Sequence, residues 1–325
     1  MVTSLLVDVV SREPLAAADG RSGSLLERVV LADGRALVVK HVLDGGDWIM
    51  RATADHGRAA ELWSAGVLAR VPEVIDHTVV GAEQVPGGWV VIMRDVSAAL
   101  VPDHARVGRD DSRRVLEAAA ALHAAFAGDP PLELCSLADR YGFLSPATAR
   151  REDGGADEVP RLIGRGWERF AEAAPADVAE PVLAVLERPA SFAAALARFP
   201  STLVQGDLKL GNLGFAGDRV VMLDWGTQTG WAPAAVEVAW YLAINWSRID
   251  ATREQVLDDF RAAEGERHDE DALRLALLGG LVQLGWDKAM HASGHPDPAI
   301  RAREAADLAW WCDRARDGLG VWSPP

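Results

Sequence analysis

The pattern of hydrophobic residues changes once along the chain, and this change constrains the fold more than any other feature. Residues 1–94 are mostly short runs of aliphatic and β-branched residues separated by turn signals, which is typical of strands. From residue 111 onward, hydrophobic residues recur at helical spacing, and only residues 202–223 interrupt them with strand-like runs. The pattern predicts an α+β fold: a small sheet-rich N-terminal lobe, residues 1–94, and a larger helical C-terminal lobe, residues 95–325.

The clearest turn signal in the N-terminal lobe is Asp33-Gly34. It lies between the apolar runs 25–31 and 35–42, and this dipeptide is common in tight β-hairpins. Further strands are expected at 13–18, 74–80 and 89–93, and a helix at 51–68. In the C-terminal lobe we expect a helix that begins at Asp111-Ser112, further helices at 161–173, 181–198, 233–247, 251–264, 270–290 and 298–317, and an irregular insertion at 127–160.

The composition excludes several classes of protein. With 49% hydrophobic and 25% charged residues, the 325-residue chain has the composition of a globular protein. No run reaches the ~20 apolar residues that span a bilayer, and the N-terminus lacks the basic region of a signal peptide, so no membrane partner is expected. Cys135 and Cys312 are the only cysteines, which favours a reducing compartment and predicts a cytoplasmic protein. The net charge of -15 disfavours a nucleic-acid partner. It suits a cationic small molecule, but it is more often an aid to solubility.

One short stretch holds the polar residues that point to chemistry. Asp207 and Asn212 lie on a loop behind the apolar run 202–204, and Asp224 ends a second apolar run at 220–223. A loop followed by a hairpin strand brings its ends together, so we expect these side chains to converge. A carboxylate and an amide oxygen suit Mg²⁺, which takes its other ligands from water and substrate phosphates. Asp207 is then placed to accept the proton of an attacking hydroxyl, and the set predicts phosphoryl transfer.

These motifs resemble those of the kinase superfamily, most closely its aminoglycoside phosphotransferase and choline kinase-like branch. That branch typically shows a His-Gly-Asp-x-x-x-x-Asn loop and then Asp-Trp or Asp-Phe at a strand end, which Gly206-Asp207, Asn212 and Asp224-Trp225 match. The resemblance implies a bilobal protein kinase-like fold, with ATP or GTP as co-substrate and Mg²⁺ held by Asn212 and Asp224. It also implies that Asp207 is the catalytic base and that Lys209 contacts the transferred phosphate.

The resemblance also assigns a nucleotide-binding lysine. Lys40 closes the apolar run 37–39 and resembles the strand lysine that pairs the nucleotide phosphates. Its expected partner is Glu61, in the helix that follows. Arg58, on the same face of that helix, offers Glu61 an ordinary ion pair instead.

Two further segments are expected to contact the nucleotide. Ser22 and Gly23 occupy the place of the phosphate-covering loop, where backbone amides can cradle phosphate oxygens, although an ordinary hairpin turn fits equally well. The base is expected to bond to backbone between Met93 and Asp95, at the end of the last strand of the N-terminal lobe.

The chain departs from the family pattern at two positions. Gln205 replaces the usual histidine before Gly-Asp, and we expect it to make similar hydrogen bonds. Glu237 stands where relatives usually carry an aspartate, and it either braces the catalytic loop or lines the acceptor site. The segment between Asp224 and Glu237 is short compared with the activation segment of a protein kinase, which favours a small acceptor over a peptide.

The acceptor site is expected between the catalytic loop and the late helices. Most of the 12 tryptophans are expected to pack in the core, but Trp231, Trp286 and the neighbouring Asp287 are candidate substrate contacts for a cationic acceptor. The acceptor can be an antibiotic of aminoglycoside, nucleoside or peptide type, as in a resistance enzyme, or a sugar or amino alcohol. A nucleotide-binding pseudokinase is the rival prediction, and the protein is expected to be a monomer or a homodimer.

Overall fold

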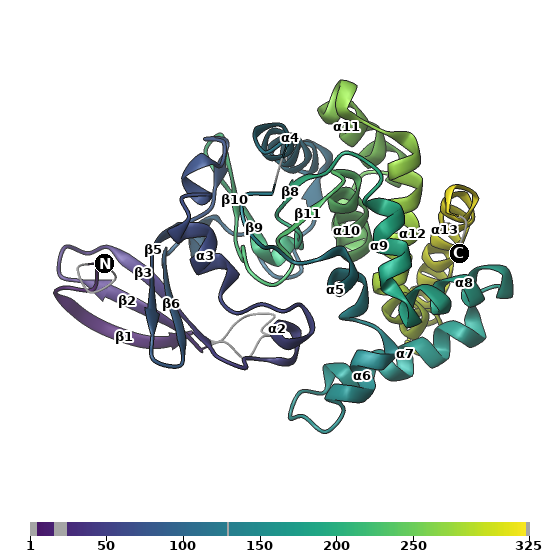
Figure 1. The fold of residues 1–325 in the computed structure, drawn as a ribbon, viewed down its shortest axis with the longest axis horizontal. Helices are drawn as coiled ribbons and strands as arrows, with labels where there is room; N and C mark the ends of the chain where they lie inside the picture. Colours follow the sequence, from purple (N-terminus) through teal and green to yellow (C-terminus); the bar gives the residue numbers. More distant parts are fainter. Residues whose placement is uncertain (1–4, 16–24, 129, 323–325) are drawn as a thin grey trace.

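The computed structural model describes residues 5–15, 25–128 and 130–322, and its N-terminal part is built on one antiparallel sheet (Figure 1). The five strands follow the order β1-β2-β3-β6-β5. Their bounds are β1 Val9–Leu15, β2 Leu25–Leu31, β3 Ala36–Leu43, β5 Val79–Val85 and β6 Gly88–Arg94. The predicted hairpin at Asp33-Gly34 joins β2 to β3, and Gly34 adopts a φ of 84° that favours glycine.

The two faces of this sheet pack against different hydrophobic clusters, and Lys40 lies on the face that is turned toward the helical part. Val39 belongs to a small hydrophobic cluster on one face, together with Val29 and Ile92. Because successive residues of a strand point to opposite faces, Lys40 points to the other side. That side carries Val42 and belongs to the hydrophobic core that continues into the helical part.

Two short helices replace the single helix predicted at residues 51–68. They are α2 Trp48–Ala52 and α3 Arg58–Ser64, followed by the 3₁₀ turn η1 Leu68–Arg70. The chain breaks between them because Ala54 and Gly57 both have positive φ. Asp55 then caps α3, since its Oδ1 accepts hydrogen bonds from the backbone of Gly57 and Arg58.

The C-terminal part is mainly helical, as predicted, and α12 lies at its centre. This helix is buried along most of its length and packs against α13, α7 and α10. The bounds are α4 Arg109–Ala125, α5 Leu137–Gly142, α6 Pro146–Glu152, α7 Val159–Ala173, α8 Ala176–Glu187, α9 Pro189–Leu196, α10 Ala235–Asn245, α11 Arg253–Glu264, α12 Glu270–Gly294 and α13 Pro298–Val321. The 3₁₀ turns are η2 Ser97–Ala99, η3 Leu210–Asn212, η4 Trp246–Arg248 and η5 Gly265–Arg267.

The structure differs from the predicted helices at two places. The run predicted at 181–198 is divided into α8 and α9, because Pro189 removes a backbone donor and starts a new helix. The insertion predicted to be irregular contains α5 and α6, whose N-caps are Ser136 and Ser145. Both serines accept a hydrogen bond from the first turn, which is a helix-start signal that the sequence contains.

Three small β-ladders position the two loops predicted to carry the chemistry. β10 Arg219–Met222 pairs with β9 Leu213–Ala216 and, in parallel, with β4 Ile75–Asp76. β8 Thr202–Val204 pairs with β11 Gly230–Ala232, and β7 Val107–Gly108 pairs with β12 Ile249–Asp250. Because Val204 lies opposite Gly230, the loop that leaves β8 and the loop that enters β11 must lie together.

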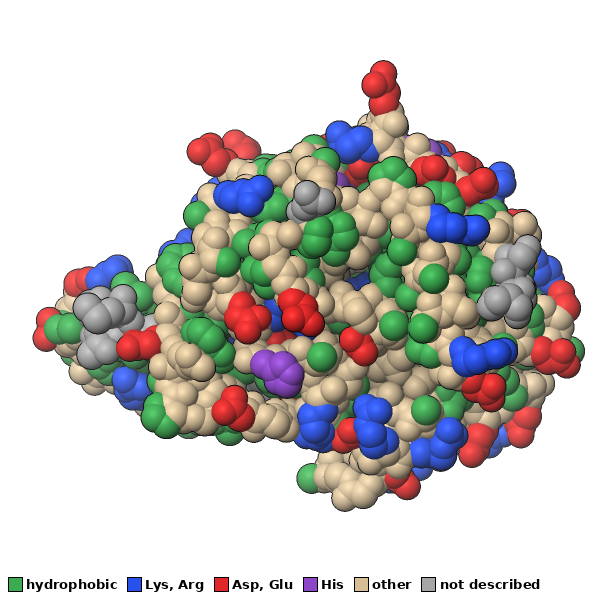
Figure 2. Space-filling model, in the orientation of Figure 1, with side chains coloured by type: hydrophobic (Ala, Val, Ile, Leu, Met, Phe, Trp, Pro, Cys, Tyr) green, Lys and Arg blue, Asp and Glu red, His purple; other side chains and the backbone are tan. Residues whose placement is uncertain are grey.

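On the face shown in Figure 2, Lys and Arg side chains are interspersed with Asp and Glu side chains rather than gathered in one patch. Across the three described ranges, no helix combines the length and the apolar character needed to cross a bilayer.

Candidate active site

Gln205 ties the two converging loops together. Its Nε2 donates hydrogen bonds to the backbone oxygens of Leu223, at 2.7 Å, and Asp224, at 3.1 Å. Its Oε1 accepts a hydrogen bond from the backbone of Asp207 at 2.7 Å. Gln205 therefore bridges the loops as expected of the residue that replaces histidine.

Asp207 is buried and held at both carboxylate oxygens. Oδ1 accepts a hydrogen bond from Trp240 Nε1 at 2.9 Å, and Oδ2 accepts one from Asn212 Nδ2 at 3.0 Å. Lys209 Nζ lies 3.8 Å from Oδ2. Burial raises the pKa of Asp207, and the positive charge of Lys209 offsets part of that rise. The carboxylate is thus fixed in one orientation, with Lys209 as the nearby cation.

Asp224 faces the N-terminal lobe. Its Oδ1 accepts a hydrogen bond from Lys40 Nζ at 2.9 Å, and this positive charge lowers the pKa of Asp224. Its backbone has a φ of 57°, in the left-handed region that is uncommon for residues other than glycine. Backbone strain of this kind is concentrated at functional sites.

The donor set fits a hard divalent cation. Asn212 donates its Nδ2 to Asp207, which leaves its amide oxygen as a free ligand, and only one oxygen of Asp224 is used by Lys40. No group of three or more His, Cys, Asp or Glu side chains able to hold a metal occurs in the described part of the chain. Mg²⁺ does not require such a group, because one or two protein ligands plus phosphates and waters satisfy it. Asn212 and Asp224 can therefore hold Mg²⁺ when a nucleotide is bound.

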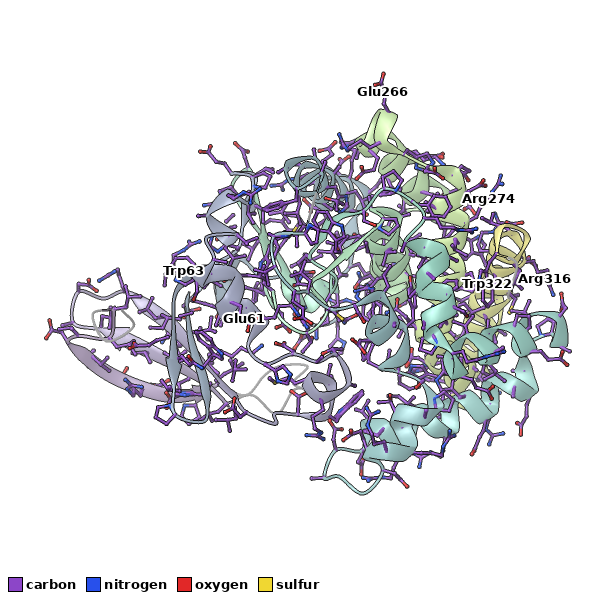
Figure 3. The ribbon with its side chains drawn as sticks, in the orientation of Figure 1. Glu61, Trp63, Glu266, Arg274, Arg316 and Trp322 are labelled. Atoms are coloured by element: carbon purple, nitrogen blue, oxygen red, sulfur yellow. The ribbon has the colours of Figure 1, made fainter. Side chains whose placement is uncertain are left out.

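Lys40 pairs with Asp224 and not with the predicted partner Glu61. Glu61 lies on α3 with an exposed side chain (Figure 3). Burial lowers the pKa of Lys40, but the charge and the hydrogen bond of Asp224, together with the charges of Asp55 and Asp47, outweigh burial and raise it. Asp55 lies just before α3 and six residues before Glu61, and its charge acts on the lysine where Glu61 was expected to.

Arg58 is not the partner of Glu61 either. It is buried, and its guanidinium donates to the backbone oxygens of Gly226 and Thr227 at 3.0 Å each and to Thr53 at 3.0 Å. Arg58 therefore links the start of α3 to the segment that follows Asp224.

The remaining nucleotide-contact predictions have different outcomes. Ser22 and Gly23 lie outside the described residues. Met93 is part of β6 and pairs with both neighbouring strands. The Asp95 carboxylate accepts from Arg28 Nε at 2.7 Å and Ser97 Oγ at 2.6 Å. The backbone N–H groups of residues 94 and 95 are also used inside the protein, because β6 stays paired to its end. These two backbone donors are therefore not free to bond to a nucleotide base.

The comparisons agree with this geometry. Residues 20–276 match the sequence profile of the phosphotransferase enzyme family. The chain belongs to that family. Its fold is the protein kinase-like fold of aminoglycoside phosphotransferases and choline or ethanolamine kinases, which indicates a kinase-type enzyme.

Solved structures with this fold differ widely from the chain in sequence. The choline kinase LicA from Streptococcus pneumoniae is 10% identical, with 96% of each chain covered and a TM-score of 0.54. The aminoglycoside phosphotransferase APH(3'')-Id from Streptomyces rimosus, solved with ADP and streptomycin, is 16% identical, with 87% of this chain and 96% of that chain covered and a TM-score of 0.54. The ethanolamine kinase Pv091845 from Plasmodium vivax is 12% identical, with 96% and 85% covered and a TM-score of 0.54. No curated protein sequence matches the chain.

Glu237 is buried and braces the loop that carries Asp207. It is 2% exposed, and its carboxylate accepts hydrogen bonds from the backbone of Gln205 at 3.1 Å and Gly206 at 2.7 Å. Gly206 has a φ of 89°, and a Cβ there would lie 2.0 Å from the backbone oxygen of Gln228. Only glycine fits at this position, and the hydrogen bond to Glu237 holds the backbone of Gly206 in place.

A buried histidine that the sequence analysis missed completes this brace. His123 of α4 lies 3.1 Å from Glu237 through Nε2 and 2.6 Å from Glu264 of α11 through Nδ1. Arg267 in turn pairs with Glu264 at 3.2 Å. Burial lowers the pKa of His123, but the hydrogen bonds to the two glutamates outweigh burial and raise it to about 9. The sequence signal that could have indicated this buried histidine is its place on the apolar face of the predicted helix.

This pKa makes stability depend on pH. Native His123 keeps its proton up to about pH 9, whereas the unfolded histidine loses it near 6.5. The stabilisation is therefore complete below pH 6.5 and is lost as pH rises to 9, with an expected slope of about 1.4 kcal/mol per pH unit in the free energy of unfolding. Urea titrations at several pH values measure this slope in the wild type and in the His123→Gln/Glu264→Gln variant. The variant has the same net charge as the wild type with His123 protonated. Parallel slopes in the two proteins would contradict the prediction, and His291→Asn, an exposed histidine, is the control.

The three other predicted substrate residues lie on α12 and β11. Trp286 is buried on α12 against Gly166 of α7, where a Cβ would lie 2.8 Å from its ring. Asp287 is partly exposed and lies 3.6 Å from His291. Trp231 is paired with Leu203 on β11. Trp286 thus packs between α12 and α7. The side chains of Trp240 and Asn245, both on α10, form hydrogen bonds with the catalytic loop.

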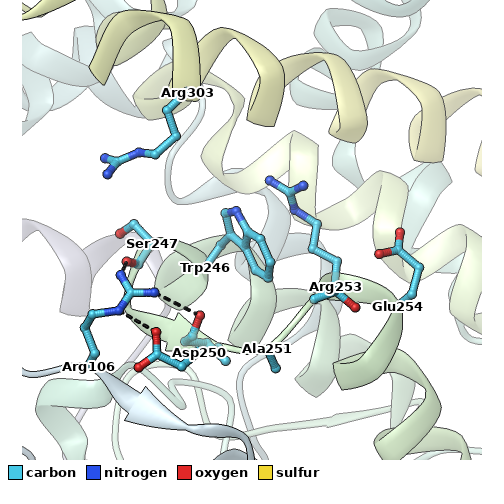
Figure 4. A pocket seen from close by; sticks show the side chains of 10 residues that line it. Arg106, Trp246, Ser247, Asp250, Ala251, Arg253, Glu254 and Arg303 are labelled. Atoms are coloured by element: carbon cyan, nitrogen blue, oxygen red, sulfur yellow. Dashed lines mark hydrogen bonds and ion pairs between the residues drawn. The ribbon is translucent and has the colours of Figure 1, made fainter. Parts of the chain in front are cut away.

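A pocket of about 560 Å³ lies where α10 ends, between the loop after it and α13 (Figure 4). The guanidinium of Arg253 covers the ring of Trp246 at 4.1 Å and that of Trp310 at 4.8 Å. Arg106 and Arg303 also line the pocket. The aromatic surface here is thus already occupied by a cation of the chain itself, unlike the open aromatic wall expected for a cationic acceptor.

Proposed function

We propose that this protein transfers the γ-phosphate of ATP or GTP to a hydroxyl group of a small molecule. The observation that carries the proposal is the convergence of Asp207, Asn212 and Asp224, joined by Gln205, opposite Lys40 of the N-terminal sheet. This is the set of a catalytic carboxylate, two oxygen ligands and a phosphate-binding cation that phosphoryl transfer uses.

Each residue has a distinct role in the proposed reaction. Asp207 orients the acceptor hydroxyl and accepts its proton, while Lys209 stabilises negative charge on the transferred phosphate. Asn212 and Asp224 would hold Mg²⁺, which would supply positive charge to neutralise the nucleotide phosphates. Lys40 would pair with the same phosphates.

The size of the acceptor follows from the chain after Asp224. Only residues 225–229 separate Asp224 from β11, which pairs directly with β8. This leaves no long segment to dock a peptide, so a small acceptor is favoured. Similar structures were solved in complex with streptomycin and with spectinomycin, and other similar proteins are choline or ethanolamine kinases. Antibiotics and amino alcohols are therefore the first acceptor classes to test.

A panel experiment tests the proposal. Labelled ATP or GTP with Mg²⁺ is offered to the protein with aminoglycoside, nucleoside and peptide antibiotics, sugars, and amino alcohols. We expect transfer to one acceptor class, with Lys40→Met weakening nucleotide affinity and leaving the fold intact. Mg²⁺-dependent nucleotide binding with no transfer, hydrolysis or autophosphorylation would instead indicate a pseudokinase.

A further inference from the structure

Arg140 of α5 is a buried cation without a carboxylate partner. It is 1% exposed, and no Asp or Glu oxygen in the described part of the chain lies within 4.0 Å of its guanidinium. Nη1 donates to the backbone oxygen of Gln228 at 3.2 Å, whereas Nε and Nη2 have no hydrogen-bond partner among the described residues. A buried arginine is normally paired, because an uncompensated charge in the interior costs several kcal/mol or more. Something nearby must offset that cost.

Two neighbours of the Arg140 guanidinium, Gly206 and Trp240, belong to the catalytic loop or bond to it. The guanidinium carbon lies 5.6 Å from the centre of the Trp240 ring. A Cβ on Gly206 would lie 2.9 Å from Arg140 Nη1, so the guanidinium packs against the residue before Asp207. A desolvated cation over an indole face gains about 2 kcal/mol or more, which offsets part of the cost of burial.

Trp240 connects this cation to the catalytic carboxylate. Its ring takes Arg140 on one face, while its Nε1–H donates to Asp207 Oδ1 at 2.9 Å. A positive charge against the ring draws electron density from the indole and makes the N–H a stronger donor, since linked polar groups polarise one another. The charge of Arg140 therefore acts on Asp207 without touching it.

We propose that Arg140 is a positioning residue that, through Trp240, holds the Asp207 carboxylate in the orientation needed for phosphate transfer. Asn212 holds one carboxylate oxygen and Trp240 the other, so the strength of the Trp240 bond decides whether the carboxylate can rotate. The catalytic part of this proposal rests on the proposed function, but the contact between Arg140, Trp240 and Asp207 does not.

The test compares Arg140→Met with the wild type and with Arg70→Met. Methionine keeps the length of the side chain and removes the charge. Arg70 is a suitable control because it also lies over an aromatic ring, that of Phe126 at 4.8 Å, away from the catalytic loop. The first measurement is the NMR resonance of the Trp240 indole N–H, assigned with Trp240→Phe. We expect it to move to lower frequency in Arg140→Met, because its hydrogen bond weakens, and to stay in place in Arg70→Met.

The second measurement is turnover with Mg·ATP and Mg·GTP, using water or the acceptor found in the panel. We expect Arg140→Met to lower turnover on the order of tenfold to a hundredfold, as misplacement of a catalytic group does, with nucleotide affinity unchanged. Arg140→Lys, which keeps the charge, should recover part of the rate. Adding Arg140→Met to Trp240→Phe should cause no further loss if Arg140 acts through the indole.

Each outcome decides the proposal. An indole resonance that is unchanged in Arg140→Met overturns it, and so does unchanged turnover with a shifted resonance. Should Arg140→Met not fold, Arg140→Gln, which also removes the charge but keeps a polar side chain, replaces it in both measurements. A wild type that transfers phosphate to nothing refutes the proposed function, and the resonance alone then decides whether Arg140 holds Asp207.

Discussion

Asp207→Asn is expected to lower the rate of phosphate transfer by a factor on the order of 10² to 10⁴, the usual contribution of a positioned general base. Asparagine keeps the size of the side chain but has no negative charge to accept the proton of the acceptor. It also offers only one acceptor oxygen to the two donors that meet the carboxylate, Trp240 Nε1 and Asn212 Nδ2. Affinity for Mg·nucleotide should stay close to that of the wild type, because Asp207 does not bind the nucleotide in the proposed reaction.

Single-turnover transfer from labelled nucleotide measures this rate, and calorimetric titration measures the affinity. Asp218→Asn is a matched control, since Asp218 is an exposed aspartate in the turn between β9 and β10. A rate for Asp207→Asn within a few-fold of this control would show that Asp207 is not the general base. The same is true if affinity and rate fall together, because that pattern indicates a binding role.

Asp224→Asn is expected to abolish the dependence of nucleotide binding on Mg²⁺. The substitution removes the charged ligand and the ion pair with Lys40 at 2.9 Å. Asparagine is the best replacement for the backbone, since it tolerates the left-handed φ of 57° better than other non-glycine residues. A loss of binding can therefore be assigned to the metal site rather than to unfolding.

The measurement is nucleotide affinity with Mg²⁺ and with a chelator. In the wild type the two values should differ, and in Asp224→Asn they should be equal, while Asp218→Asn should behave as the wild type does. Retention of a Mg²⁺-dependent gain in Asp224→Asn would mean that the cation is held elsewhere. Thermal unfolding of each variant confirms that the fold is intact.

The sequence was most informative where the residues of the site are close together in the chain. The loop from Gln205 to Asn212 and the strand before Asp224 form one hairpin-like unit, so spacing alone predicted that their side chains converge. The hairpin at Asp33-Gly34 was predicted for the same reason, because turn chemistry is local. The breaks at Ala54 and Pro189 were missed, since a continuous apolar run does not reveal a backbone turn inside it.

Long-range partners could not be predicted in this way. Lys40 was expected to pair with Glu61, but Glu61 is exposed on α3 and Asp224 meets the lysine instead. Trp240 resembled the other helical tryptophans in sequence, and only the packing of α10 beneath the loop gives its N–H to Asp207.

By itself, the sequence predicted the sheet-rich N-terminal lobe, the helical C-terminal lobe and the candidate site residues Asp207, Asn212 and Asp224, because these depend on local periodicity and short loops. Only the tertiary structure decided the partners of the buried charges Lys40, His123 and Arg140. Such partners lie up to 184 residues away, as Asp224 does from Lys40. A buried charge requires compensation from whatever the fold places beside it, and that choice is made by packing rather than by neighbours in the chain.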